Sequence, residues 1–390
     1  MTVTRPADPP IGGNVDPAFA VVRDAFEANF TPTEGDPGDL GASVHVIVDG
    51  RCVVDLWGGW ADLEGSRPWK ADTLVNAYSV GKAMVAATVL SVVADGTLDL
   101  DAPLAGVWPE FAAHGKGAVT LRDAMAHRAA VPGIDRPVAD DEVFDFERIA
   151  AAVAETEPWW EPGSAHGYHV NTLGHVLGEP VRRVTGRTVG AVLRERFAGP
   201  LDADVWFGLP ASEHGRVAEV DFVQHVPEEF RPHGGPTRLE RMRRAAYFNP
   251  EGLSGIGTVN TTRWREAEVP STNLHATARG VARVFASLLA DDGPVPGSLV
   301  AEAARTHSSG HDLVLDRDSH FGLAMMLHQD GRPIGTSPAS YGHFGNGGSL
   351  GFADPAAGLA FGYVINRPGD RWQVPRTRRL LDALRTCLGA

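Results

Sequence analysis

The chain of 390 residues contains only two cysteines, Cys52 and Cys387, which lie near its opposite ends. Their spacing matches neither a zinc site nor a redox motif. So little cysteine is typical of the reducing cytoplasm, where disulfides are rare. With 43% hydrophobic residues, the chain has enough apolar material for sizeable cores. We therefore expect a globular cytoplasmic protein.

The sequence also lacks a membrane segment and an excess of positive charge. No run of 18 apolar residues occurs, and residues 1–17 contain no apolar core of a signal peptide. The formal net charge of −14 repels nucleic-acid phosphates and anionic lipids. These features exclude nucleic-acid and membrane partners and favour a small-molecule substrate. They leave the oligomeric state open.

Lysine is scarce as well, because only three of the 35 basic Lys and Arg residues are lysines. One of them, Lys82, lies three positions after Ser79, at the start of the apolar helix predicted for residues 77–96. Residues i and i+3 of a helix are neighbours. Burial lowers the pKa of a lysine, so its amine can take a serine proton, whereas arginine stays protonated. The Ser-x-x-Lys pattern predicts a nucleophilic serine with a lysine base.

Two other interpretations compete with this prediction. Lys82 could extend along the helix surface to water, with the Ser-x-x-Lys pattern arising by chance. Residues 347–351 match the G-x-S-x-G motif of α/β-hydrolases, which would make Ser349 the nucleophile. That motif needs a following helix and a later histidine, but the sequel resembles a hairpin and His343 is the last histidine. Ser349 is therefore the weaker candidate.

Three histidines, at positions 166, 169 and 175, suggest a zinc site at first sight. Their spacing fits no zinc motif, and no carboxylate stands between them. We expect these side chains to make local hydrogen bonds, and we predict neither a metal nor a cofactor.

Strand patterns lie near both ends of the chain, and helical patterns fill its middle. Residues 43–62 contain two β-rich runs joined by Asp49-Gly50, a strong hairpin signal. Helices are predicted for residues 16–30 and 276–293, the second followed by several strand-like runs. This order predicts an α+β fold with an antiparallel sheet flanked by helices.

We expect the sheet domain to be discontinuous and built from both termini, residues 1–78 and 276–390. A mainly helical domain, residues 79–275, would be inserted between them and carry the nucleophile helix at its boundary. Within it, residues 209–265 show weak periodicity and are predicted to be irregular, with a possible role as a lid. The site would lie in the cleft between the domains.

Beyond Ser79-Val80-Gly81-Lys82, three segments follow a known pattern: TLRDAMAHRAAVPG (120–133), EPGSAHGYHVNTLGHVLGEPVRRVTG (161–186) and YGHFGNGGSLGFADP (341–355). Together they resemble the serine β-lactamase-related hydrolases. This superfamily includes class C β-lactamases, D-alanyl-D-alanine peptidases and, most similar here, family VIII carboxylesterases. The resemblance implies the β-lactamase/transpeptidase-like fold.

The resemblance also implies roles for particular residues. Ser79 would be the acylated nucleophile, and Lys82 and Tyr168 would share the work of the general base. A lysine ammonium next to Tyr168 would favour the phenolate, which could accept the serine proton. The backbone N–H groups of Ser79 and Asn346 would form the oxyanion hole.

The chain departs from the family pattern in the segments that bind substrate. The third motif is His343-Phe344-Gly345 where many members have Lys-Thr-Gly, which weakens a clamp on a substrate carboxylate. Val170 stands where penicillin-recognising members have an asparagine, with Asn171 one position later. In the 120–133 segment, Ala129-Ala130 replaces the family's Ser-Gly, although His127 matches. The changes at the third motif and at Val170 favour esters.

Tryptophans near the second motif are candidates for the substrate pocket. We name Trp160 and Trp264 as possible substrate-binding residues, together with the third-motif residues His343, Phe344 and Gly345. The plain alternative for both tryptophans is core packing, because aromatic side chains bury large areas in any domain.

The predicted function is a serine hydrolase that cleaves small carboxylic esters through an acyl-enzyme on Ser79. Three alternatives remain open at this point. The scaffold could serve an acyltransferase or amide-forming enzyme, or a β-lactamase or D-amino-acid peptidase. A catalytically idle binding protein is the third.

Overall fold

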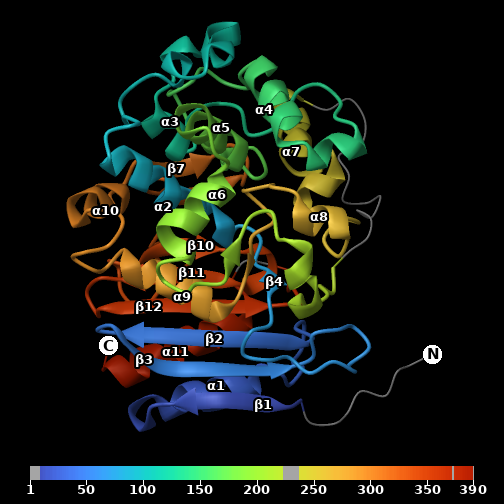
Figure 1. The fold of residues 1–390 in the computed structure, drawn as a ribbon, viewed down its shortest axis with the longest axis vertical. Helices are drawn as coiled ribbons and strands as arrows, with labels where there is room; N and C mark the ends of the chain where they lie inside the picture. Colours follow the sequence, from blue (N-terminus) through green and yellow to red (C-terminus); the bar gives the residue numbers. More distant parts are fainter. Residues whose placement is uncertain (1–8, 223–236, 371–372, 390) are drawn as a thin grey trace.

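The structure is a computed structural model that describes residues 9–222, 237–370 and 373–389. Its centre is a nine-stranded antiparallel sheet with the order β1-β3-β2-β12-β11-β10-β9-β8-β7 (Figure 1). The strands are β1 (Ile11–Val15), β2 (Gly41–Val48), β3 (Arg51–Gly59), β7 (Ser308–Asp312), β8 (Arg317–Phe321), β9 (Met326–Leu327), β10 (Tyr341–Phe344), β11 (Leu350–Asp354) and β12 (Leu359–Ile365). Strands from the two ends of the chain meet where β2 pairs with β12. The predicted α+β fold class is confirmed.

The β2–β3 hairpin turns at Asp49 and Gly50, as predicted. Both residues have positive φ, 48° and 74°, which is the geometry of the tight turns that join twisted antiparallel strands. Because β2 lies between β3 and β12, most of its residues are buried on both faces of the sheet. The apolar run 43–48 therefore forms the middle of the sheet rather than its edge.

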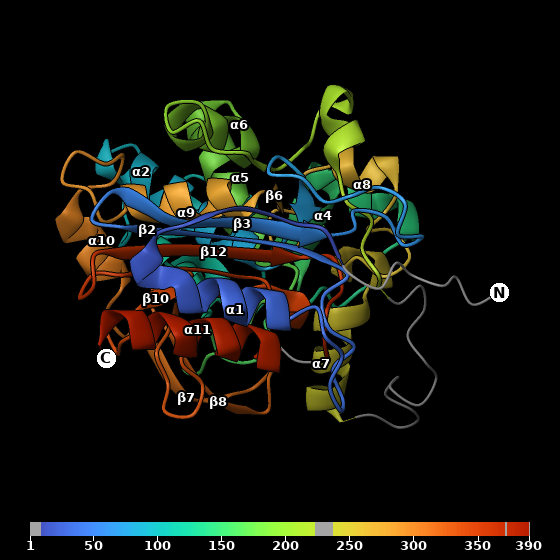
Figure 2. The ribbon, with the colours of Figure 1, turned by 90° about the horizontal axis from the view of Figure 1, so that it is seen from below.

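Helices cover both faces of the sheet (Figure 2). On one face lie α1 (Ala20–Ala28) and α11 (Pro375–Leu388), and on the other lies α9 (Ala278–Ser287). Glycines in the strands allow α9 to pack closely against the sheet. A Cβ on Gly362 would lie 2.2 Å from the carbonyl oxygen of Ala278, too close for any other residue. A Cβ on Gly351 would lie 2.5 Å from the ring of Phe285. This close packing holds α9 against the strands next to the site.

The remaining helices are α2 (Val80–Ala94), α3 (Leu121–Met125), α4 (Phe146–Glu155), α5 (Leu173–Thr185), α6 (Val189–Leu193), α7 (Arg238–Phe248), α8 (Thr262–Glu266) and α10 (Gly297–Ala303). Most of them lie on the α9 side of the sheet, with α2 among them, whereas α7 lies toward the α11 side (Figure 2). A small second sheet joins β4 (Val75–Asn76), β6 (His275–Ala276) and β5 (Val205–Trp206).

Helix α2 is buried on nearly every side, which explains why its sequence is apolar all round. It packs between β10 on the sheet and the helices α5 and α6. In the part of the chain that the structure describes, no helix is both long and apolar enough to cross a bilayer. The division into domains 1–78 with 276–390 and 79–275 stays a prediction.

The prediction that residues 209–265 are irregular is wrong for part of this segment. Helix α7 occupies Arg238–Phe248 and begins with a capping box, in which Thr237 and Glu240 satisfy each other's backbone N–H groups. The arginine-rich stretch 231–250 also fits a solvated helix face, the alternative to a lid, and α7 agrees with it, because only Met242 and Ala246 of this helix are buried. Residues 223–236, the centre of the possible lid, lie outside the described residues.

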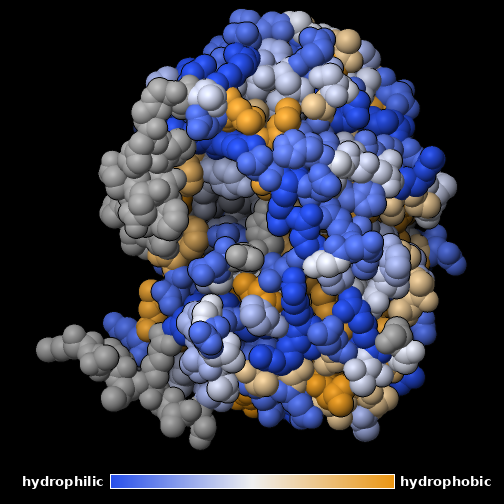
Figure 3. Space-filling view, turned by 180° about the vertical axis from the view of Figure 1, so that it is seen from behind, coloured by the Kyte–Doolittle hydropathy of each residue, from blue (hydrophilic) through white to orange (hydrophobic). Residues whose placement is uncertain are grey.

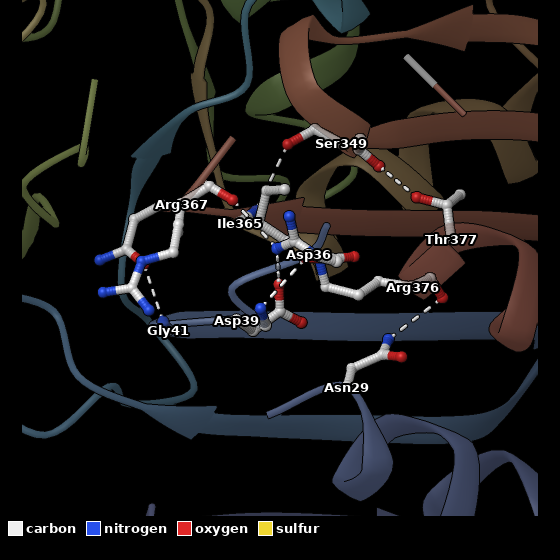
Figure 4. Close-up of polar contacts among 12 residues, drawn as sticks. Asn29, Asp36, Asp39, Gly41, Ser349, Ile365, Arg367, Arg376 and Thr377 are labelled. Carbon is white, nitrogen blue, oxygen red and sulfur yellow. Dashed lines mark hydrogen bonds and ion pairs between the residues drawn. The ribbon is translucent and has the colours of Figure 1, made fainter. Parts of the chain in front are cut away.

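A buried charge network joins the two ends of the chain beneath the sheet (Figure 4). Arg376, in the first turn of α11, forms ion pairs with Asp36, at 3.0 Å, and with Asp39. Its carbonyl oxygen accepts a hydrogen bond from the Asn29 side chain at 3.1 Å. Burial raises the pKa of Asp39 in spite of the neighbouring guanidinium. The network therefore costs desolvation and depends on every partner being present.

We expect Arg376→Met to lower the free energy of unfolding by about 3–5 kcal/mol, because it leaves two buried carboxylates without a cation. Urea unfolding followed by circular dichroism measures this change. The matched control is Arg148→Met, which removes one partner of an exposed ion pair with Asp145 and should cost less than about 1 kcal/mol. Equal effects of the two substitutions would contradict the prediction.

Candidate active site

Ser79 lies at the N-terminal end of α2, between the helical half and the sheet. Tyr78, which precedes it, has φ of 50°, a conformation that side chains disfavour and that surrounding contacts must hold. The N–H of Ala77 donates to the carbonyl of Leu274 at 2.7 Å. On the other side Gly345 comes so close that a Cβ would lie 2.4 Å from the Ala77 carbonyl oxygen. This position therefore requires glycine, and it brings the third motif beside Ser79.

Lys82 lies one turn into α2 and is fully buried. Its Nζ lies 3.0 Å from Ser79 Oγ, 2.6 Å from the carbonyl oxygen of Val170 and 3.0 Å from that of Ser271. Burial lowers the pKa of Lys82 well below its ordinary value, which favours the neutral amine. A neutral amine has two N–H bonds and one lone pair. In the structure Nζ is placed as donor to Ser79 Oγ as well; if the amine is neutral, as burial favours, the two carbonyls can take both N–H bonds and leave the lone pair for the Ser79 hydroxyl.

Tyr168 lies on the other side of the serine. Its hydroxyl is hydrogen-bonded to Ser79, and Lys82 Nζ lies 4.9 Å from the centre of its ring. Tyr168 is buried, and burial raises the pKa of its phenol above the ordinary value. Burial thus favours the uncharged forms of both Lys82 and Tyr168. In the resting protein, burial therefore disfavours the Tyr168 phenolate that the family resemblance implied.

The sequence analysis missed Asp312, which holds the backbone of Tyr168. The Tyr168 N–H donates to both carboxylate oxygens of Asp312, at 3.0 and 3.1 Å. The same carboxylate accepts hydrogen bonds at 2.9 Å from the N–H groups of Val314 and Leu315 and from the Ser319 hydroxyl. No motif marks Asp312, because it follows Tyr168 by 144 positions and only the β7–β8 hairpin brings it there.

His343, on β10, is stacked against Tyr168 with ring centres 5.9 Å apart. Its Nδ1 lies 2.7 Å from the carbonyl oxygen of Phe344, which assigns the proton to Nδ1. Burial lowers the pKa of His343 to about 3. This histidine is therefore uncharged at neutral pH and offers no cation to a substrate carboxylate.

Asn346 lies in the turn that follows β10, next to a pocket of about 660 Å³ that Phe344 also lines. The turn is held from two sides. The Gly345 N–H donates to the Ser349 carbonyl at 2.7 Å, and the Thr377 hydroxyl donates to the Gly348 carbonyl at 2.8 Å (Figure 4). Asn346 thus lies at the mouth of a pocket on a fixed turn. That its backbone N–H group donates to the oxyanion stays a prediction.

Ser349, the rival nucleophile, lies in the same turn but is buried and followed by strand β11. Its Oγ accepts a hydrogen bond from the Ile365 N–H at 3.3 Å (Figure 4). The strand–turn–helix that a G-x-S-x-G nucleophile requires is absent at this described position. The contacts of Ser349 are thus those of a residue that stabilises the turn, and not those of a nucleophile.

The two tryptophans named for substrate binding lie outside the lining of this pocket. Trp264 is fully buried in the helical half, and its Nε1 donates to Asn76 at 3.1 Å. Trp160 is half-buried and donates to the Ala165 carbonyl at 3.2 Å. These contacts are those of packing residues, and a role in binding substrate stays a prediction for both.

Of the three histidines expected to make local hydrogen bonds, His166 and His169 do so, whereas His175 is buried and stacks on the Phe146 ring, with ring centres 4.9 Å apart. His166 Nε2 lies 2.9 Å from the Ser319 hydroxyl, and His169 Nε2 accepts the Val131 N–H at 3.2 Å. His127 Nδ1 accepts the N–H of His169 at 3.1 Å. Among residues 9–222, 237–370 and 373–389, no group of three or more His, Cys, Asp or Glu side chains is placed to hold a metal ion.

Comparisons with known proteins agree with this arrangement. A family model described as Beta-lactamase matches residues 26–385. "Esterase/beta-lactamase LipL" of Mycobacterium tuberculosis (strain ATCC 25618 / H37Rv) is 34% identical over 382 residues, which cover 91% of this chain and 82% of the relative. "Esterase EstB" of Burkholderia gladioli is 28% identical over 372 residues, 88% and 90% of the two chains. The crystal structure of a family VIII carboxylesterase is 36% identical, with a TM-score of 0.87, over 97% of this chain and all of the other.

The chain therefore belongs to the beta-lactamase family, as its four motifs predicted. Its fold is the β-lactamase/transpeptidase-like fold. The family match extends over nearly the whole chain, so it includes both the nucleophile helix and the strands that carry the third motif.

The buried histidines of the site predict acid-sensitive stability. Burial lowers the pKa of His169 to about 4 and that of His343 to about 3, whereas both return to about 6.5 on unfolding. Below pH 6.5 the unfolded chain binds more protons, so the free energy of unfolding falls as the pH falls. The expected slope is about 1.4 kcal/mol per pH unit for each histidine.

Urea midpoints at pH 7.5, 6.5 and 5.5 would measure this loss. His343→Asn keeps a side-chain N–H for the Phe344 carbonyl but removes one titrating group, so its stability should depend less on pH. A variant with the same pH dependence as the wild type would show that His343 does not contribute.

Proposed function

We propose that this serine ester hydrolase cleaves small carboxylic esters through an acyl-enzyme on Ser79, with the neutral amine of Lys82 as its base. The enzyme class agrees with the relatives named as esterases and with the carboxylesterase structure. The observation that carries the assignment of residues is the contact of 3.0 Å between Lys82 Nζ and Ser79 Oγ, in a cluster where Val170 and Ser271 occupy both amine N–H bonds.

Acylation follows from this geometry. The Ser79 hydroxyl gives its proton to the lone pair of Lys82 while Oγ forms a bond with the ester carbonyl carbon. The carbonyl oxygen becomes an oxyanion, which the N–H groups of Ser79 and Asn346 would stabilise. The ammonium that forms on Lys82 then lies beside the Tyr168 ring, and a neighbouring positive charge lowers the pKa of a phenol.

Tyr168 would act as the acid for the leaving group. As the tetrahedral intermediate collapses, the phenol O–H protonates the departing alkoxide, and the alcohol leaves. Proton transfer from the Lys82 ammonium restores the phenol and the neutral amine. A water molecule then gives a proton to Lys82 and attacks the acyl carbon. This releases the carboxylic acid and returns the proton to Ser79.

Two features near the nucleophile favour esters over peptides and β-lactams. The uncharged His343 offers no cation for a substrate carboxylate next to the reacting bond. The Asn171 side chain, which might have recognised a substrate amide, already donates to the Ala246 carbonyl and to Ser254 Oγ, both at 3.0 Å. The Val170 side chain cannot replace it, because it has no polar atom.

Ser79→Ala should lower kcat/KM for a short-chain 4-nitrophenyl ester by about a thousandfold or more, because the acyl-enzyme cannot form. Its unfolding midpoint should match that of the wild type. The matched control is Ser349→Ala, which should keep activity within about tenfold. Loss of activity in the Ser349 variant with retention in the Ser79 variant would assign the nucleophile to the other motif.

The pH profile tests the proton positions. Since Lys82 must be unprotonated, kcat/KM should fall only as the pH drops through its lowered pKa, well below 10.5. The raised pKa of Tyr168 predicts no loss of the acid form, and so a flat profile, up to about pH 9. A rate that rises steadily toward pH 10 would instead indicate that a phenolate is the base.

A further inference from the structure

The pocket at Asn346 has a lining of mixed character. Part of its lining is apolar and buried, with Phe344, Met326 and Ile334, and Phe344 directly precedes Gly345, which packs against Ala77 next to Ser79. Phe321, which also lines the pocket, stacks on the Tyr168 ring at 5.9 Å.

The outer wall of the pocket carries charged side chains. They are Arg317, Arg332, Arg378, Asp318 and Asp370. Four of these side chains are exposed, and Arg332 is half-buried. Strand β8 and helix α11, which carry most of them, lie on the side of the sheet that Figure 3 faces. In that view the surface is hollowed, with strongly hydrophilic side chains beside the hollow.

Two of these arginines have no carboxylate partner among the described residues. Arg332 donates to the carbonyl oxygen of Asp318 at 2.8 Å, and Arg378 approaches the carbonyl of Gly331 at 3.5 Å. Neither forms an ion pair with a described side chain, although the protein has an acidic excess of 14 charges. By contrast, Arg216 pairs with two carboxylates elsewhere on the surface.

A guanidinium without a partner, at the mouth of a pocket, is suited to bind a carboxylate. The apolar part of the lining suits an aliphatic or aromatic segment. His343 is uncharged and so offers no cation beside the reacting carbonyl, whereas Arg332 and Arg378 are cations of the pocket lining. The pocket thus matches a molecule that is apolar near its ester and negatively charged at its tip.

We propose that the preferred substrates are esters with a carboxylate at the far end of an apolar segment, bound by Arg332 and Arg378. This inference rests on the proposed function and adds a substrate class to it. It agrees with the weakened carboxylate clamp at the third motif, because the region around the ester bond would be neutral and only the tip charged. The carboxylate could belong to the acyl part or to the alcohol part of the ester.

Two matched pairs of esters distinguish these sources. The first pair is 4-nitrophenyl hydrogen adipate and 4-nitrophenyl hexanoate, which differ by a carboxylate at the end of the acyl chain. The second is 4-carboxyphenyl hexanoate and 4-carbamoylphenyl hexanoate, which place the charge on the leaving group. For one pair we expect kcat/KM to be at least about fivefold higher for the charged ester at low ionic strength, and the ratio to fall in 0.5 M NaCl.

The double variant Arg332→Gln with Arg378→Gln should bring this ratio close to one. The matched control, Arg148→Gln with Arg305→Gln, removes the same amount of charge from exposed ion pairs outside the pocket and should keep the ratio. A wild-type ratio of one or less for both pairs would overturn the inference, as would a ratio that the Arg332/Arg378 variant leaves unchanged. Cleavage of none of the four esters would contradict the proposed function and the inference with it.

Discussion

The proposed chemistry depends on one buried amine. Lys82 is removed from water, and its Nζ donates to the carbonyls of Val170 and Ser271; in the proposed mechanism this burial is what allows Lys82 to act as a base. If either carbonyl moved away, the amine would lose a hydrogen bond inside a dry site, at a cost of about 1–3 kcal/mol. The helices that surround α2 keep these two carbonyls in place.

The sheet supplies the other side of the site, and its position depends on both ends of the chain. Gly345 approaches Ala77 so closely that β10 and the start of α2 are fixed relative to each other. Behind β10, α11 holds the Asn346 turn through Thr377, and the neighbouring Arg376 ties α11 to Asp36 and Asp39. The charge network thus helps to hold the helix that supports the turn with the proposed oxyanion donor.

Charge is distributed around the site in a way that separates catalysis from recognition. Lys82, Tyr168 and His343 all favour their neutral forms, because burial penalises charge. In the proposed mechanism the neutral centre provides a lone pair on Lys82 and a phenolic proton on Tyr168. Arg332 and Arg378, which have no carboxylate partner among the described residues, line the pocket where they are half-buried and exposed, so that water reduces the cost of keeping them charged.

The sequence by itself determined the family, the α+β class, the β2–β3 hairpin and the pairing of Ser79 with Lys82, because these depend on neighbours along the chain: periodicity, an Asp-Gly turn, a spacing of three residues on a helix. It could not determine the protonation of Lys82 and Tyr168, the anchoring of Tyr168 by Asp312, or the arginines at the pocket. Those properties arise from burial and from contacts between residues more than a hundred positions apart. Only the tertiary structure decides them, because desolvation and long-range pairing exist only once the chain has folded.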